Sequence, residues 1–402
     1  MKFIRSIIAF LLVVSLCACT EAESQVGETT DSTAFDEITE TADLTETEKD
    51  EEPPEPETVS IIMAGDVLLH TRVTASGDFG DKYDYGHLFA NCRDIIYNAD
   101  LAIVNQEVIL GGSELGLTGY PSFNGPYEVG DALVSAGFDV VLHATNHAID
   151  KGKRGIINCT RYWEENHPEI KAVGIYATEE ASETICTVQA GSATVAILNY
   201  TYGTNGIPLP SDMPYCVDLL TYDREDEIRG DIAAAKEIAD IVIVAPHWGT
   251  EYTHVPGDFQ KYWTDVFFEC GVDLVLGTHP HVVQPFEIIE DEGHSMAVYY
   301  SVGNYVNATE QWGSVTQRML GALADVEFTL CNGEWIISRA DAIPIVSHVE
   351  TDAPGELTVY PLSEYTEELA SENEIIRQDP NFSLEALREI NEKVLSEKET
   401  EE

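Results

Sequence analysis

From about Thr58 onward, short apolar runs alternate along the chain with segments whose apolar residues recur at helical spacing. The runs with the length and composition of buried strands cover residues 59–66, 101–107, 138–147, 193–200, 239–249, 272–279, 296–304 and 321–330. Helical patterns such as "YEVGDALVSAG" and "REDEIRGDIAAAKEIAD" separate several of them. Val- and Ile-rich runs alternating with helices are typical of α/β domains whose sheets are covered on both faces. The pattern predicts one large α/β domain over residues 58–350.

Polar side chains gather where these apolar runs stop. Five of the runs end in a carboxylate, an amide or an imidazole: Asp66, Glu107, Asn146 with His147, His247, and His279 with His281. Because open α/β folds bind ligands at the carboxyl ends of their strands, we expect these side chains to lie close together. Taken singly, Asp66 could cap a helix, and Glu107 or Asn146 could serve a turn.

The two imidazoles in "GTHPHVVQ" flank Pro280. Proline fixes its own φ and favours an extended conformation at the residue before it. Residues i and i+2 of an extended segment project to the same side. The spacing therefore predicts an extended backbone that aims His279 and His281 at one place.

Carboxylates, an amide oxygen and imidazoles together form a set of metal ligands. Imidazole with carboxylate suits Zn, Mn or Fe, and the lack of cysteine argues against a structural zinc. The set exceeds the needs of one tetrahedral site, so it predicts two divalent ions that share a bridging carboxylate. Such pairs activate water and clamp both oxygens of a phosphoryl displacement.

The chain begins with an export signal. Lys2 and Arg5 precede the apolar residues 7–16, which are too few to form a comfortable membrane span. The following "LCAC" resembles a bacterial lipobox, which predicts a lipoprotein signal over residues 1–19 and lipidation of Cys19. The alternative is an ordinary cleaved signal without lipid. The expected location is extracytoplasmic, with a lipid anchor in the bacterial cell membrane.

Acidic segments flank the domain. Residues 20–57 contain fifteen acids and one Lys, which predicts a disordered linker between membrane and domain. Residues 351–402 form an acidic C-terminal tail with one amphipathic helix, because four apolar residues recur there at helical spacing: Leu384, Leu387, Ile390 and Val394. The net charge of −51 excludes a general nucleic-acid binder. Six cysteines lie outside the signal without any C-x-x-C pair, and we expect mostly free, buried thiols.

Several ordered motifs resemble those of the CapA family, which is associated with bacterial poly-γ-glutamate capsule synthesis. They are "MAGDVLLH", "NQEV", "FNGPYEVGDALVSAGFDVVLHATNHAIDKG", "PHWGTEY", "GVDLVLGTHPHVVQPFEII" and "YYSVGNYV", and they run from about residue 59 to 306. CapA domains are related to calcineurin-like metallophosphoesterases. The resemblance therefore implies a four-layer α/β/β/α sandwich with the site at the strand ends.

By position, the resemblance also implies a role for each site residue. Asp66 matches a ligand of one metal, Glu107 the bridging ligand and Asn146 a ligand of the second metal. The remaining matches are His147 as the catalytic histidine and His247, His279 and His281 as metal ligands. His70 and Glu251 are further candidates, Glu251 as an acceptor that orients an imidazole. Two features depart from the superfamily: "GDVLLH" replaces D-x-H, and Glu107 stands where an aspartate is usual.

Three functions follow as hypotheses. The first is a surface-anchored protein that takes part in poly-γ-glutamate synthesis or export through a metal site, together with other proteins of that machinery. The second is an extracytoplasmic metal-dependent phosphoesterase with another substrate. The third is a non-catalytic scaffold with a vestigial site, which the charge disfavours because an acidic surface repels a polyanion.

Overall fold

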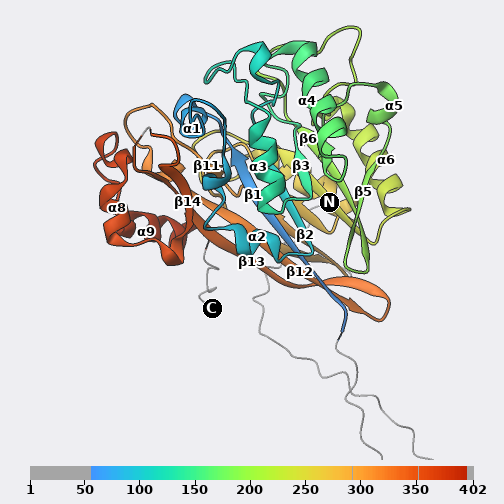
Figure 1. Cartoon of the computed structure of the whole chain (residues 1–402). Coiled ribbons are helices and arrows are strands. Elements are labelled where there is room, and N and C mark those ends of the chain that lie inside the picture. The colour runs from blue at the N-terminus through green and yellow to red at the C-terminus, as the bar shows by residue number, and fades with distance from the viewer. Residues whose placement is uncertain (1–55, 292, 352, 396–402) are drawn as a thin grey trace, which may run out of the picture. The chain divides into compact units, whose positions relative to one another are not determined.

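Two β-sheets form the centre of the computed structural model, which describes residues 56–291, 293–351 and 353–395 (Figure 1). The first sheet has the order β14-β13-β12-β1-β2-β3-β4, with β11 paired to β1. Its strands are β1 (Thr58–Val67), β2 (Leu101–Asn105), β3 (Val140–Leu142), β4 (Lys171–Val173), β11 (Asn304–Val306), β12 (Leu320–Cys331), β13 (Glu334–Val349) and β14 (Leu357–Pro361). The predicted signal over residues 1–19, Cys19 and almost all of the predicted linker lie outside the described residues.

The second sheet has the order β5-β6-β7-β8-β10-β9. Its strands are β5 (Cys186–Ala190), β6 (Ala193–Thr201), β7 (Ile241–His247), β8 (Leu274–Leu276), β9 (Phe286–Asp291) and β10 (His294–Tyr299). Strands β1 to β4 are parallel in the first sheet, and β6, β7, β8 and β10 are parallel in the second. Each sheet therefore presents a row of carboxyl ends along one edge, where loops can place functional side chains.

Alternation along the strands sorts the core into layers. In β1, the side chains of Val59, Ile61 and Met63 belong to a buried cluster that also contains Ile197 and Ile243 of the second sheet. The intervening residues of β1 point the other way, since successive strand side chains alternate between faces. The cluster therefore fills the space between the two sheets. Because further clusters cover the outer faces, the strands are buried on both sides, and their sequences are near-continuous apolar runs.

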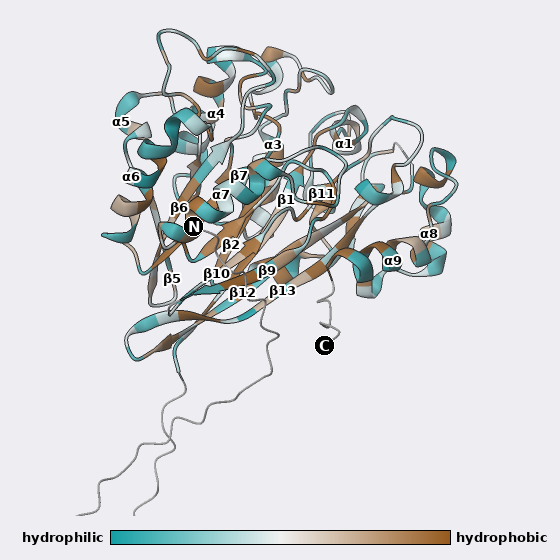
Figure 2. Ribbon diagram, turned by 180° about the vertical axis from the view of Figure 1, so that it is seen from behind, coloured by the Kyte–Doolittle hydropathy of each residue, from teal (hydrophilic) through white to brown (hydrophobic). Residues whose placement is uncertain are grey.

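Helices cover the outer face of each sheet. Against the first sheet pack α1 (Thr71–Ser76), α2 (Arg93–Tyr97), α3 (Glu128–Ala136) and α4 (Gly152–Asn166), and against the second pack α6 (Glu225–Lys236) and α7 (Asp258–Glu269). Also present are α5 (Glu179–Ser182) and the 3-10 helices η1 (Gly86–Leu88), η2 (Ser113–Leu115), η3 (Tyr222–Arg224), η4 (Thr316–Arg318), η5 (Leu362–Glu364) and η6 (Glu374–Arg377). Figure 2 shows largely hydrophobic strands beneath helices with hydrophilic outer surfaces. The predicted α/β class is confirmed.

The residues after 350 contribute to the same core. Strand β14 pairs antiparallel with β13, and α8 (Glu367–Glu372) and α9 (Leu384–Val394) follow it. Helix α9 buries Leu384, Leu387 and Val394 in the cluster on the outer face of the first sheet. Residues 353–395, assigned above to an acidic tail, therefore belong to the compact unit Pro56–Glu397, because their apolar face is buried while their acids face water.

A buried carboxylate fastens this C-terminal segment to the turn that precedes β12. Asp379 Oδ2 accepts hydrogen bonds from the backbone N–H groups of Val315 and Thr316, both at 3.0 Å, and from Thr316 Oγ1 at 2.6 Å. Helix η4 begins at Thr316 and ends at Arg318. The C-terminal segment thus holds the backbone from which Arg318 projects.

Two further findings concern membrane spans and thiols. Among the described residues, no helix is long and apolar enough to cross a bilayer. The six cysteines of this part of the chain are free, as expected; three are buried and three are partly exposed.

Candidate metal centre

The six predicted metal ligands converge from the carboxyl ends of both sheets. Asp66 lies near the end of β1, and Glu107 and Asn146 follow β2 and β3. His247 ends β7, and His279 and His281 lie in the loop after β8. Asn146 Oδ1 is 2.9 Å from His247 Nε2, and Asp66 Oδ2 is 3.2 Å from His281 Nδ1. Residues from two sheets and five separate segments therefore meet in one place.

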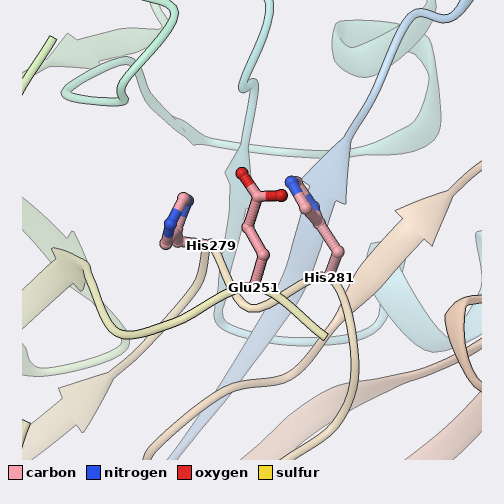
Figure 3. Close-up of side chains that lie close together, drawn as sticks. All are labelled: Glu251, His279 and His281. Carbon is pink, nitrogen blue, oxygen red and sulfur yellow. The ribbon is translucent and has the colours of Figure 1, made fainter. Parts of the chain in front are cut away.

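Two overlapping groups in this cluster are arranged so that they could hold a cation. Asp66, Glu107 and His281 form one group, and Glu251, His279 and His281 form the other. Within each group the candidate ligand atoms lie within 4.8 Å of one another. Figure 3 shows the carboxylate of Glu251 between the imidazole rings of His279 and His281. His281 is common to both groups, and Glu251, a possible ligand or an orienting acceptor by sequence, lies among the candidate ligands.

Glu107 is fully buried, yet its carboxylate has no hydrogen-bond partner. Neither Oε1 nor Oε2 finds a donor among the described residues; Oε1 lies 3.6 Å from His281 Nε2 and 4.0 Å from His247 Nε2. Burial therefore raises the pKa of Glu107 well above its usual value. Because native proteins rarely leave buried carboxylate oxygens unpaired, this side chain fits a divalent cation.

The imidazoles divide into two kinds. Burial, reinforced by the neighbouring histidines, lowers the pKa of His247 and His279 well below the usual value, which keeps them neutral and able to bind a metal. His279 Nδ1 is buried without a partner in the described part of the chain. Burial also acts to lower the pKa of His281, but Glu107 and then Asp66 raise it to about 10. Without a cation, this imidazole balances the two carboxylates.

Neighbouring side chains that the sequence did not single out orient the ligands. Asn105 Nδ2 donates to Asp66 Oδ1 at 2.8 Å, and Thr278 Oγ1 lies 2.9 Å from His247 Nδ1. Asn304 Oδ1 lies 3.0 Å from His281 Nδ1, so His281 Nε2 is left to face Glu107. Such partners set ring orientation and tautomer. Asn105 and Thr278 adjoin or nearly adjoin predicted ligands in the sequence, but nothing local to them reveals the contact.

His147, the predicted catalytic residue, is held by a carboxylate. Its Nδ1 lies 2.7 Å from Asp150 Oδ2, and its ring meets Phe123 edge to face with centroids 4.7 Å apart. By such a pairing a carboxylate can position a histidine for acid or base chemistry at its other ring nitrogen. Asp150 lies three residues after His147, and this spacing is the signal in the sequence that could have indicated the pair.

His70 lies beside the ligand groups and in neither of them. It precedes α1, its ring is 5.6 Å from that of Phe123, and burial lowers its pKa to about 4. A small cavity is lined by Leu68, His70, Tyr252, His281, Asn304, Asn307, Thr309 and Arg318. His70 therefore borders the space next to His281.

The backbone around Pro280 is not extended, and that prediction is wrong. His279 has φ +97° and His281 has φ +57°, both in the left-handed region that non-glycine residues avoid. Tertiary contacts hold this conformation: the His279 N–H donates to Asp66 Oδ2 at 3.3 Å, and the Pro280 carbonyl accepts from the Tyr252 N–H at 2.8 Å. Strain of this kind persists where the surroundings enforce it. The two rings nevertheless lie only 5.8 Å apart.

His143 lies close in sequence to Asn146, but its side chain packs beneath α4 and is in neither ligand group. Trp163 Nε1 donates to His143 Nε2 at 2.9 Å, which requires a neutral ring, and burial lowers the pKa of His143 to about 3. The unfolded chain takes up this proton near pH 6.5, so the stabilising contribution is present above pH 6.5 and is lost as the pH falls toward 3. A buried neutral histidine thus makes the fold sensitive to acid.

We expect His143→Gln to lose less stability on acidification than the wild type, by about 2 kcal/mol between pH 6.5 and pH 5. Denaturant unfolding of both proteins at these two pH values measures the difference. An equal loss in both proteins would contradict the assignment of His143 as a neutral acceptor.

Comparison with known proteins finds one family whose match covers the segments that carry the candidate ligands. The model of the family described as "Bacterial capsule synthesis protein PGA_cap" matches residues 60–309. The PGA biosynthesis protein CapA of Bacillus subtilis (strain 168) is 30% identical over 223 residues, 55% of this chain and 54% of that protein. The capsule biosynthesis protein CapA of Bacillus anthracis is 25% identical over 261 residues, 63% and 60% of the two chains. The chain thus spans little more than half the length of these relatives.

Solved structures resemble the chain only loosely. A novel phosphatase from Mycoplasma pneumoniae has a TM-score of 0.43 at 17% identity, covering 72% of this chain and 94% of that one. The calcineurin-like phosphoesterase YfkN from Bacillus subtilis has a TM-score of 0.38 at 13% identity, covering 82% and 99%. At these scores the likeness carries no conclusion about function.

Proposed function

The chain belongs to the bacterial capsule synthesis protein family PGA_cap, and on that premise we propose that it takes part in poly-γ-glutamate synthesis or export through a divalent-metal site. The observation that carries the proposal is the convergence of Asp66, Glu107, Asn146, His247, His279 and His281, with the Glu107 carboxylate buried and unpartnered among the described residues. The names of the matched relatives refer to PGA and capsule biosynthesis, and they are the reason for proposing poly-γ-glutamate as the polymer.

The proposed site binds two cations. The size of the donor set supports this number, because two carboxylates, an amide oxygen and three imidazoles exceed the needs of one tetrahedral ion. Mn, Zn or Fe suits such a donor set. When bound, the cations would supply an activated water and a clamp for developing negative charge. His147, fixed by Asp150, would carry the proton to or from the reacting oxygen.

A four-layer sandwich of the metallophosphoesterase type is part of the same proposal. Helices on the outer face of each sheet and a shared core between the sheets support it. We further propose that Cys19 carries a lipid, that the acidic residues 20–57 tether the domain to the outer face of the cell membrane, and that other proteins of the polymer machinery are its partners. The "LCAC" motif supports the lipid anchor.

A phosphoesterase that acts on another substrate is the second candidate. The pairing of His147 with Asp150 beside the ligand groups favours it, because a positioned acid–base group suits hydrolysis and serves no purpose in a passive scaffold. Turnover of a generic phosphodiester by the metal-loaded protein would support this candidate, and loss of that turnover in His147→Asn at unchanged metal content would assign the histidine.

The main proposal is tested in a polymer-forming host that lacks its own protein of this family. We expect the wild-type chain to restore cell-associated poly-γ-glutamate and Asp66→Ala to restore less than about a tenth of it, because removing a ligand leaves the other buried charges unpaired. Immunoblotting verifies equal amounts of both proteins. Equal restoration by both would refute a need for the site, and failure of both would refute the role in this polymer.

A further inference from the structure

We infer that Arg318 binds an anionic oxygen group, a carboxylate or a phosphoryl group, next to the candidate metal centre. The residue lies at the end of η4, outside the family match over residues 60–309. This inference rests on the proposed function for the identity of the molecule that carries the anion. The placement of the guanidinium group is independent of it.

Stacking contacts connect Arg318 to the site. Its guanidinium carbon lies 3.8 Å from the centroid of the Tyr252 ring, and that ring is 6.0 Å from the ring of His281. Arg318, Tyr252, His281 and His70 line the same small cavity. The guanidinium therefore borders the space into which His281, common to both ligand groups, also faces.

The donors of Arg318 are only partly used. One terminal nitrogen donates to Gln311 Oε1 at 2.6 Å, whereas Nε is buried without a hydrogen-bond partner in the described residues. Among the ion pairs of these residues, carboxylates pair with Arg72, Arg224, Arg229, Arg339 and Arg377, and none pairs with Arg318. The Arg318 guanidinium therefore keeps its positive charge beside the cavity, with no carboxylate partner in the described residues.

The backbone beneath Arg318 is held rigidly. Its carbonyl oxygen accepts hydrogen bonds from Asn304 Nδ2 at 3.1 Å and Asn307 Nδ2 at 3.4 Å. Asp379 fixes Val315 and Thr316, which lie three and two residues before Arg318. Asn304 also orients His281, so one amide joins the arginine turn to the ligand. A donor fixed in this way loses little entropy on binding.

The charge of Arg318 beside the candidate metal centre favours an anionic ligand. A guanidinium beside a cation site repels the cation, and an anion that contacts both removes this repulsion. Arginine presents a planar fork that matches carboxylate and phosphate oxygens in a bidentate manner. The side-chain carboxylates of a glutamate polymer and the phosphoryl oxygens of a phosphoester share this chemistry. Arg318 is therefore a positioning residue for whichever of the two the site receives.

The test uses the full-length protein loaded with Mn²⁺, with its metal content measured first. Inorganic phosphate and a short γ-linked glutamate oligomer are titrated calorimetrically into the wild type, Arg318→Gln and Arg318→Lys. We expect Arg318→Gln to weaken binding of at least one probe by about 10- to 100-fold, as for loss of hydrogen bonds to a charged group. Arg318→Lys keeps the charge but loses the fork, and we expect it to fall between the other two.

Arg339→Gln is the matched control. Arg339 forms an ion pair with Asp325. Its strand neighbour Glu327 lies opposite Ser60, at the start of β1. The candidate ligand Asp66 lies near the other end of β1, so Arg339 is remote from the candidate metal centre. This variant loses the same charge, and we expect it to bind both probes as the wild type does. Binding of the oligomer alone assigns a carboxylate, and binding of phosphate alone assigns a phosphoryl group.

The inference is overturned if Arg318→Gln binds both probes as tightly as the wild type, or if the wild type binds neither. If Arg318→Gln does not fold, as judged by its thermal unfolding, Arg318→Lys decides by the same criteria. A wild-type protein without metal would refute the proposed function, whereas full metal content with an unaffected Arg318→Gln would refute only the role of Arg318.

Discussion

The His247→Ala, His279→Ala double variant is expected to retain less than about a tenth of the divalent metal that the wild type binds. His247 contacts Asn146, lies 3.9 Å from Asp66 and 4.0 Å from Glu107, and is thus central to the cluster. His279 completes the group with Glu251 and His281. Even partners that only orient a metal ligand account for 10- to 100-fold in affinity, so loss of two direct ligands should cost at least about 100-fold.

Elemental analysis after dialysis against Mn²⁺ or Zn²⁺ measures this loss. The matched control is His167→Ala, His294→Ala, which also removes two imidazoles. His167 pairs with Asp131 near the surface and His294 contacts the carbonyl of Val272, both outside the ligand groups. We expect full metal content in the control. Equal metal in the wild type and in the His247, His279 variant would show that the cluster is not a metal centre.

Glu107→Gln is expected to stabilise the metal-free protein and at the same time abolish its stabilisation by metal. The carboxylate is buried without a hydrogen-bond donor among the described residues, so at neutral pH the metal-free fold bears the cost of an unsatisfied polar group, about 1 to 3 kcal/mol. The neutral amide reduces that cost. In the wild type, a cation at one hundred times its Kd adds about 2.7 kcal/mol. The variant lacks the negative carboxylate at this position and should gain almost none of it.

The pH dependence has a definite sign. Burial raises the pKa of Glu107, so the metal-free folded state binds more protons than the unfolded state above a pH of about 4.3. Stability from this group is present below that pH and is lost as the pH rises toward the folded-state pKa. The raised pKa of His281 acts in the same direction. The advantage of Glu107→Gln over the wild type should therefore grow between pH 5 and pH 8.

Denaturant unfolding with a chelator and with Mn²⁺, at several pH values, measures both effects. Glu114→Gln is the matched control, because Glu114 is exposed and accepts hydrogen bonds from Tyr127 and Asn158 outside the cluster. We expect this control to respond to metal like the wild type. If the metal-free Glu107→Gln protein were less stable than the wild type, the unpaired carboxylate would not be the feature that recruits a cation.

Much of the fold could be predicted from local sequence. All eight predicted apolar runs overlap a strand, and the helical patterns at "YEVGDALVSAG" and "REDEIRGDIAAAKEIAD" coincide with α3 and α6. The strands that were missed are short or partly exposed, such as β4 and β13, so their apolar residues give a weaker signal. The segment after residue 350 was assigned to a tail because its abundant acids hide the apolar face that α9 buries.

The sequence by itself determined which side chains would stand at strand ends, because the period of two along a strand and the residue that stops it are local properties. Only the tertiary structure decided which of them meet. The left-handed backbone at His279 and His281 depends on contacts with Asp66 and Tyr252. Asp66 lies more than 200 residues before this loop, and Tyr252 lies about 30 residues before it. The placement of Arg318 depends equally on distant partners. Such contacts follow from strand order and from the packing of two sheets, which no local pattern encodes.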